Sequence, residues 1–160
     1  IIVNEDLGTY QVFPKHYCYG DYGTLYGLYR GYEYLKDEKG KKLALSLVLK
    51  SHDIGYEPPI LVAGPSLLYG HSGLAMLFRR FHRHSGIEAF EQVYQAMLEH
   101  LIDCYDECDT FLGYKGYWNQ SEKTTNYSFF EGILGIGLAL MSVESEEVRL
   151  LFEEFFFLKD

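Results

Sequence analysis

The chain has 160 residues, the length of one ordinary domain, and 48% of them are hydrophobic, which is enough to bury a sizeable core. Its net charge of −9 argues against nucleic acid and anionic membrane surfaces as partners, because both attract basic surfaces. No apolar run reaches the roughly 20 residues that span a bilayer, and we expect no signal peptide. Three cysteines are too few for a disulfide framework, which favours a reducing, cytoplasmic compartment.

The first third of the chain is expected to hold two helices after a lead-in. Residues 1–19 are predicted to be extended or irregular. Apolar residues then recur at helical spacing over about residues 22–36, with Asp21 as the capping residue. The charged segment 37–42 is interpreted as a turn, and a second apolar helix is expected from 43 to 52.

The middle of the chain predicts a second pair of helices. A short apolar helix is expected over residues 74–84, and it ends in the basic cluster Arg79–His84. We interpret that cluster as cations favoured by the helix dipole rather than as an anion site. Ser85 and Glu88 have the spacing of a capping box, which predicts the start of an amphipathic helix over about residues 87–105.

The last third predicts a long loop and a third pair of helices. Residues 109–128 are polar and glycine-rich and contain the only tryptophan, Trp118, as is typical of functional or poorly ordered loops. Residues 133–142 are predicted to form a helix of glycine, alanine and large aliphatic residues. Ser145 is expected to cap a final helix whose apolar residues face inward.

A glycine-x-x-glycine step precedes the first helix of each pair. The three copies are Gly20–Gly23, Gly70–Gly73 and Gly132–Gly135, and such a recurring local signature indicates a repeat architecture. The copies also align the residues before them, which are Cys18, Leu68 and Phe130 two positions before the first glycine and Tyr19, Tyr69 and Glu131 one position before it.

These repeats predict an all-α fold of three helical hairpins. A helix that is apolar all round must be buried on all sides, so the glycine-rich helices are expected to form an inner layer and the amphipathic helices an outer one. This alternation is typical of an α/α toroid, and three hairpins form only an arc of it. We therefore expect the exposed inner surface to be covered by missing upstream repeats or by a homo-oligomer.

The three motifs together resemble the lanthionine synthetase C-like family, the cyclases of lantibiotic biosynthesis. The segments that carry the resemblance are YCYGDYG at residues 17–23, LLYGHSGL at 67–74 and FEGILGIGL at 130–138. In the family they correspond to a WCYGxPG, a CHGxxG and an EGxxGxG-type motif. The resemblance implies an α/α barrel of about seven hairpins, of which residues 1–160 would be a single domain, the C-terminal portion.

The resemblance also implies zinc, held by the cysteine of the first motif and by the adjacent cysteine and histidine of the second. Cys18 keeps the first ligand position, but Leu68 and Tyr69 stand at the other two. Leucine has no donor, and the tyrosine phenol is a poor ligand near neutral pH because its pKa is about 10. We therefore expect zinc to be absent and Cys18 to be a buried small hydrophobe, with His71 and His16 as alternative ligands.

The implied activity is thioether ring formation, in which a cysteine of a precursor peptide adds to a dehydrated serine or threonine. The family's acid–base residues lie in upstream repeats and have no counterparts that can be placed on this chain. The alternative is a non-catalytic relative that binds a modified precursor peptide or a biosynthetic partner protein. Residues expected at the peptide-binding mouth are Tyr19, Asp21, Tyr69, His71 and Trp118. A third reading, a glycan-cleaving toroid, would pair the carboxylates of Asp21 and Glu131.

Overall fold

The computed structural model describes residues 2–4, 9–11, 16–18, 20–53, 64–105, 113–114 and 126–155. The chain divides into two compact units, Ile1–Val62 and Ala63–Asp160. Within the described residues, no helix has both the length and the hydropathy that crossing a bilayer requires.

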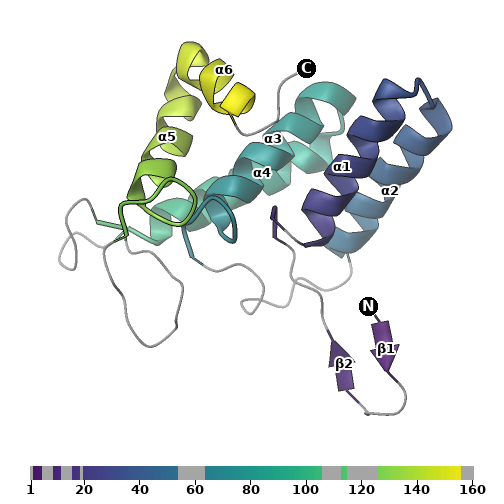
Figure 1. Ribbon diagram of the computed structural model, residues 1–160, viewed down its shortest axis with the longest axis horizontal. Coiled ribbons are helices and arrows are strands. Elements are labelled where there is room, and N and C mark those ends of the chain that lie inside the picture. Colours follow the sequence, from purple (N-terminus) through teal and green to yellow (C-terminus); the bar gives the residue numbers. More distant parts are fainter. Residues whose placement is uncertain are drawn as a thin grey trace. The chain divides into compact units, whose positions relative to one another are not determined.

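The first unit contains a short β-hairpin and one helical hairpin (Figure 1). Strands β1 (Ile2–Asn4) and β2 (Thr9–Gln11) pair antiparallel, with Val3 opposite Tyr10. Helices α1 (Asp21–Tyr34) and α2 (Glu38–Asp53) pack side by side. Their buried residues are Tyr22, Tyr26 and Tyr29 from α1 and Ala44 and Val48 from α2.

Helix α2 begins five residues earlier than its apolar pattern predicted, because Asp37 caps it. The Asp37 Oδ1 atom accepts hydrogen bonds from the amides of Lys39 and Gly40, both at 3.0 Å. A side-chain oxygen that satisfies amides of the first turn is what an N-cap provides. The ring of Tyr32 packs over Gly40, where a β-carbon would lie 2.2 Å from it. The charged segment is therefore the first turn of the helix rather than a turn between helices.

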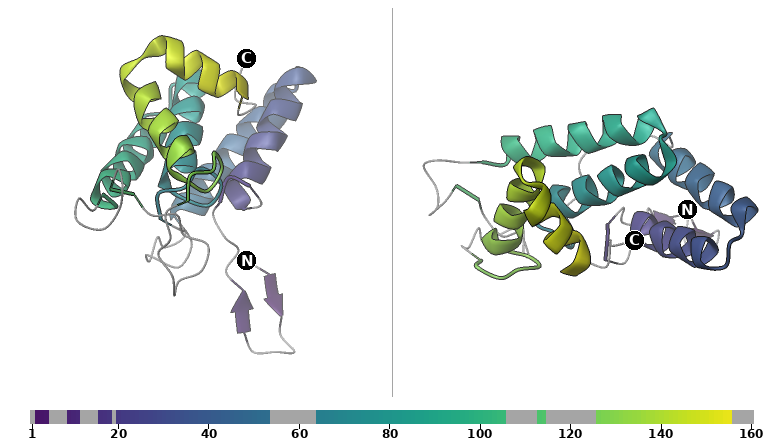
Figure 2. Two further views of the ribbon diagram at one scale, coloured as in Figure 1. Left: turned by 60° about the vertical axis from the view of Figure 1, so that its left-hand side comes forward. Right: turned by 90° about the horizontal axis from the view of Figure 1, so that it is seen from above.

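The second unit contains two helical hairpins. Helices α3 (His71–Ser85) and α4 (Glu88–Asp103) run side by side, and helices α5 (Ile133–Glu144) and α6 (Glu146–Phe155) form the other hairpin (Figures 1 and 2). Every residue from Ser72 to Phe81 in α3 is buried. The inward face of α4 consists of Phe90, Val93, Tyr94, Met97 and Leu101. The rings of Phe78, Phe81 and Phe90 lie in mutual contact, with centroids 5.3–6.0 Å apart.

The predicted capping box before α4 is wrong. Ser85 is the last residue of α3, and Gly86 follows it in the left-handed conformation, with φ of 68°. Glycine adopts this conformation without the penalty of a β-carbon, which makes it a common helix terminator. The N-cap of α4 is Ile87, without a side-chain cap hydrogen bond. At the last helix the prediction is confirmed, because the amide of Val148 donates to Ser145 Oγ at 3.3 Å.

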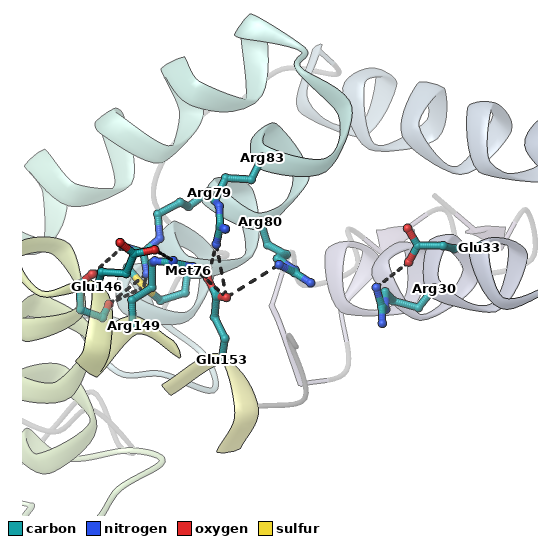
Figure 3. Close-up of polar contacts among 10 residues, drawn as sticks. Arg30, Glu33, Met76, Arg79, Arg80, Arg83, Glu146, Arg149 and Glu153 are labelled. Atoms are coloured by element: carbon teal, nitrogen blue, oxygen red, sulfur yellow. Dashed lines mark hydrogen bonds and ion pairs between the residues drawn. The ribbon is translucent and has the colours of Figure 1, made fainter. Parts of the chain in front are cut away.

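A group of charged side chains joins the second hairpin to the third (Figure 3). Glu153 of α6 is 4% exposed, and its carboxylate accepts hydrogen bonds from Arg83 of α3 at 3.1 Å and from Arg149 of α6 at 3.1 Å. Arg80, 2% exposed, lies 3.7 Å from the same carboxylate. We call these four residues the Glu153 cluster. Their carboxylate and guanidinium groups are paired, as buried charges need to be.

Arg79 makes a separate contact between α3 and α5. Its guanidinium donates to the carbonyl oxygen of Ser142 at 2.9 Å and to Ser142 Oγ at 3.1 Å. It also lies over the ring of Tyr94, 5.7 Å from the ring centroid. Burial lowers the pKa of Arg79 from its ordinary value. The basic cluster Arg79–His84 is thus in part an internal set of contacts, and not only a group of cations at a helix end.

Three helical hairpins, each beginning with a glycine-led helix, confirm the predicted all-α class. Among the described residues, the strands are β1 and β2, of three residues each. Both lie in the segment that was predicted to be extended or irregular. The first helix of each hairpin starts within its glycine-x-x-glycine step, at the residue after the first glycine. The fold is thus stabilised by packing between helices, and each hairpin begins at a glycine turn.

Candidate functional site

The first glycine of each motif is the N-cap of a helix, and the three copies have nearly the same backbone. Their φ and ψ angles are −104° and −179° at Gly20, −119° and −170° at Gly70, and −118° and −170° at Gly132. Any residue adopts such extended angles, so the need for glycine at Gly70 and Gly132 is steric. A β-carbon at Gly70 would lie 2.2 Å from the oxygen of Gly64, and one at Gly132 would lie 2.1 Å from that of Asn126.

The second glycine is covered by a carbonyl group in all three turns. A β-carbon at Gly23 would lie 1.7 Å from the oxygen of Tyr17. The same substitution would bring 1.8 Å contacts at Gly73, with Leu67, and at Gly135, with Phe129. Each covering residue stands six positions before its glycine. Contacts under 3.0 Å are essentially never observed for a real β-carbon, so these turns admit only glycine.

The second and third turns lie side by side within the second unit. The amide of His71 donates to Gly64 and that of Ile133 donates to Asn126, at 2.9 and 2.8 Å, so both turns close in the same way. In addition, the amides of Leu67 and Leu68 both donate to the carbonyl oxygen of Phe130, at 3.1 Å each. These bonds bring the residues that precede the two glycine steps to one place.

The first turn places its predicted site residues differently from what the sequence suggested. Cys18 is exposed, so the prediction of a buried hydrophobe is wrong, whereas His16 is buried. The carbonyl of His16 accepts a hydrogen bond from the amide of Gly23 at 3.4 Å. Asp21 is the first residue of α1 rather than its cap, and it accepts a hydrogen bond from Ser51 Oγ at 3.5 Å. Tyr19 lies outside the described residues.

Tyr17, next to Cys18, is a neutral phenol at physiological pH. Burial, followed by the effects of the neighbouring Tyr26 and Cys18, raises its pKa to about 12. A phenol with this pKa neither donates a negative charge to a metal nor acts as a base near neutral pH. The first turn therefore offers one exposed thiol as its reactive group.

The second turn carries Leu68, Tyr69 and His71. Leu68 and Tyr69 are half-buried, and the Tyr69 amide donates to Ser66 Oγ at 3.4 Å. The ring of His71 lies against that of His100 from α4, with centroids 5.3 Å apart. Burial, followed by the effect of His100, lowers the pKa of His71 to about 4. His71 is thus neutral at physiological pH.

The third turn exposes apolar side chains. Tyr127 is 62% exposed, Phe130 46% and Leu134 54%. We call these three residues the turn-3 apolar patch. Of the three, Phe130 adjoins the second turn, because its carbonyl oxygen accepts the amides of Leu67 and Leu68. Trp118, the remaining residue predicted at the mouth, lies outside the described residues.

This architecture defines a class of proteins built from helical hairpins, in which a close-packed glycine turn precedes the first helix of each hairpin. Within that class, the sequence model of the lanthionine synthetase C-like protein family matches residues 3–157. The chain therefore belongs to the lanthionine synthetase C-like family, whose fold is the α/α toroid. A search of curated proteins found no match.

The residues present do not fit the zinc that the family implies. At the two ligand positions of the second turn, Leu68 offers no donor atom and Tyr69 offers a phenol. Among the described residues, no three or more His, Cys, Asp and Glu side chains are grouped so as to hold a metal ion. A catalytic zinc site needs three protein ligands and one open position. Of the three ligand positions that the family implies, Cys18 alone keeps a ligand residue.

Sequence reasoning missed the contact between His71 and His100. The position of His100 in the last turn of α4 is explained by the helix dipole, which favours a cation there, and nothing in the local sequence points to His71. The two residues meet because α3 and α4 run side by side. A contact that depends on helix packing leaves no signature in either segment alone.

Proposed function

We propose that this chain is a domain of a protein in lantibiotic-type peptide modification, where a cysteine of a precursor peptide adds to a dehydrated serine or threonine to close a thioether ring. The observation that supports the proposal most is the family match over residues 3–157, joined to three turns of one construction. The free thiols of Cys18 and Cys104 are compatible with the reducing cytoplasm in which we place this activity.

We propose no zinc-dependent step for this chain, because Leu68 and Tyr69 stand at two of the three ligand positions of the family's zinc site. In the family, the zinc makes the substrate thiol a thiolate and thereby a nucleophile. The residues described here are proposed to do a different task, the binding of the peptide. The turn-3 apolar patch, together with Tyr69, offers aromatic side chains, which are strong contributors to peptide and protein interfaces.

A second candidate function is a non-catalytic relative that binds the precursor peptide or a biosynthetic partner. The observation in its favour is specific, namely the presence of Leu68 and Tyr69 at the ligand positions. Both candidates share the peptide-binding role and differ in whether ring closure takes place.

A ring-closure assay separates the two candidates. The protein of the full reading frame is incubated with a dehydrated precursor peptide, and free peptide thiols are counted by alkylation and mass spectrometry. Loss of thiols that depends on the protein supports the first candidate. Unchanged thiols together with measurable peptide binding support the second.

Peptide binding itself is tested by fluorescence anisotropy with a labelled dehydrated peptide. Replacement of Tyr69 or Phe130 by alanine is expected to weaken binding by about tenfold, since a central aromatic contact contributes roughly 1–2 kcal/mol or more. The matched control is Tyr34→Ala, because Tyr34 is 88% exposed near the end of α1 opposite its glycine turn. Equal losses in all three variants, or no binding by the unchanged protein, would contradict a binding role for the mouth.

A further inference from the structure

Two imidazoles from different helices meet beside the second glycine turn. His71 is the first residue of α3, and its backbone is held by the hydrogen bond to Gly64. His100 lies in the last turn of α4 and is exposed. The ring centroids are 5.3 Å apart and the rings are tilted by 33°. The site is thus fixed from two sides and reached from solvent through His100.

One ring nitrogen of His71 makes no hydrogen bond within the part of the chain that the structure describes. Among the described residues, Nδ1 of His71 is buried without a hydrogen-bond partner. Buried polar atoms are nearly always satisfied, so an orphaned ring nitrogen calls for an explanation. A neutral imidazole nitrogen keeps a lone pair, and that lone pair is what a metal ion accepts.

We propose that His71 and His100 form a two-imidazole site for a borderline transition-metal cation such as Zn²⁺ or Ni²⁺. Two imidazoles on one tetrahedral metal have ring centroids about 5 Å apart, as follows from metal–nitrogen bonds of about 2.0–2.1 Å. Imidazole ligands select such metals over Mg²⁺ and Ca²⁺, which prefer oxygen. With two side-chain donors, the remaining positions of the metal stay open for water or for an added ligand.

This site is separate from the family's ligand positions. It uses neither Cys18 nor the positions of Leu68 and Tyr69, and it does not depend on the proposed function. The competing explanation is a packed histidine pair in which His100 serves only the dipole of α4. The two explanations differ in what metal titration shows.

The test is isothermal titration of the whole chain with ZnCl₂ and NiCl₂, with MgCl₂ as the control metal. We expect one equivalent of Zn²⁺ or Ni²⁺ and no binding of Mg²⁺. His71→Gln and His100→Gln are each expected to weaken binding roughly tenfold or more, since each removes one of two ligands. Because His100 is exposed, H100Q keeps the test valid even if H71Q does not fold.

Two further variants serve as matched controls. His82→Gln removes a histidine of α3 that is paired with Glu91 at 2.8 Å, and Cys18→Ala removes the family's ligand. Both are expected to bind metal as the unchanged chain does. In ¹⁵N spectra of the imidazoles, the signals of His71 and His100 are expected to shift with metal while that of His82 does not. The proposal is overturned if the unchanged chain binds no metal, if H100Q binds as tightly, or if Cys18→Ala abolishes binding.

Discussion

At the second glycine of each turn, a single hydrogen atom makes the close approach of the chain possible. Gly73 sits under the carbonyl oxygen of Leu67, which belongs to the backbone and cannot swing aside. Gly73→Ala is therefore expected to destabilise the fold by about 3 kcal/mol or more, as strained backbone positions do. Urea unfolding followed by circular dichroism measures the change.

The control for this prediction is another helical glycine. A β-carbon at Gly137 in α5 would meet nothing within 4 Å. Gly137→Ala is expected to stabilise the chain by about 0.5–1 kcal/mol, because alanine loses less conformational entropy in a helix. Equal effects at Gly73 and Gly137 would contradict the steric role of the turns.

His71 makes stability depend on pH in a defined window. Its pKa is about 4 in the folded chain and 6.5 when unfolded, so between these values the unfolded state binds a proton that the folded state does not. Stability is therefore expected to fall as the pH drops from about 6.5 to about 4, by at most about 3 kcal/mol, and then to level off.

Comparing the unchanged chain with the His71→Phe variant separates the contribution of His71 to the pH dependence of stability from that of the carboxylates. Urea midpoints of the unchanged chain and of His71→Phe are compared at pH 7 and pH 4.5. The unchanged chain is expected to lose more stability than the variant on acidification. Parallel losses would show that His71 does not titrate as its burial implies.

The residue positions that decide the chemistry could be aligned from the sequence, but their surroundings could not. Counting back from the glycines places Cys18, Leu68 and Phe130 at equivalent positions, and the closely similar geometry of the three turns supports that alignment. The exposure of Cys18 and the contact between His71 and His100 depend on packing of whole helices. Neither is encoded by the neighbours of these residues in sequence.

At the scale of elements, the Glu153 cluster fixes α6 on α3. Glu153→Gln would leave Arg80, Arg83 and Arg149 around a neutral amide. Because removal of one partner from a buried ion pair leaves charge uncompensated, we expect a loss of about 3–5 kcal/mol. Thermal unfolding measures the loss, and hydrogen exchange is expected to increase first in α6.

Glu147→Gln is the matched control for this prediction. Glu147 lies in the first turn of the same helix and is exposed. Exposed charges of this kind contribute roughly 0–1 kcal/mol. Similar destabilisation by both substitutions would mean that the cluster adds nothing to the contact between the two hairpins.

The spacing of apolar residues predicted which segments form helices, but it did not predict where the helices end or which helices contact one another. The cap at Asp37 and the left-handed Gly86 moved two boundaries, because a polar side chain and a glycine can serve either neighbouring segment. The basic residues at the end of α3 were interpreted as cations favoured by the helix dipole, whereas the structure pairs Arg80 and Arg83 with Glu153 of α6. Their pairing joins segments about 70 residues apart, for which local sequence has no rule.

At the scale of the molecule, the two glycine-led helices of the second unit differ in how much they bury. In α3 ten consecutive residues are buried, whereas in α5 Leu134 is 54% and Met141 55% exposed. These two positions lie on one face of α5, seven residues apart. Cover by further repeats or by a second copy of the chain, predicted from the sequence, remains a prediction.

An exposed face of this kind is expected to bind apolar dye and to promote self-association. We expect the chain alone to increase the fluorescence of anilinonaphthalene sulfonate and to show concentration-dependent size in light scattering. Leu134→Glu combined with Met141→Glu is expected to reduce both effects without a change in helix content. A monomeric chain with no dye binding would show that the face needs no cover.

The second and third turns are closed by main-chain amides and carbonyl groups, which do not depend on the side chains at the two positions before the glycine. The hydrogen bonds from Leu67 and Leu68 to Phe130 use backbone atoms that any residue at position 68 other than proline would supply. The backbone of the turn can therefore present different side chains at this position. Leu68→Cys with Tyr69→His would place a thiol and an imidazole at the family's two ligand positions while leaving these backbone hydrogen bonds in place.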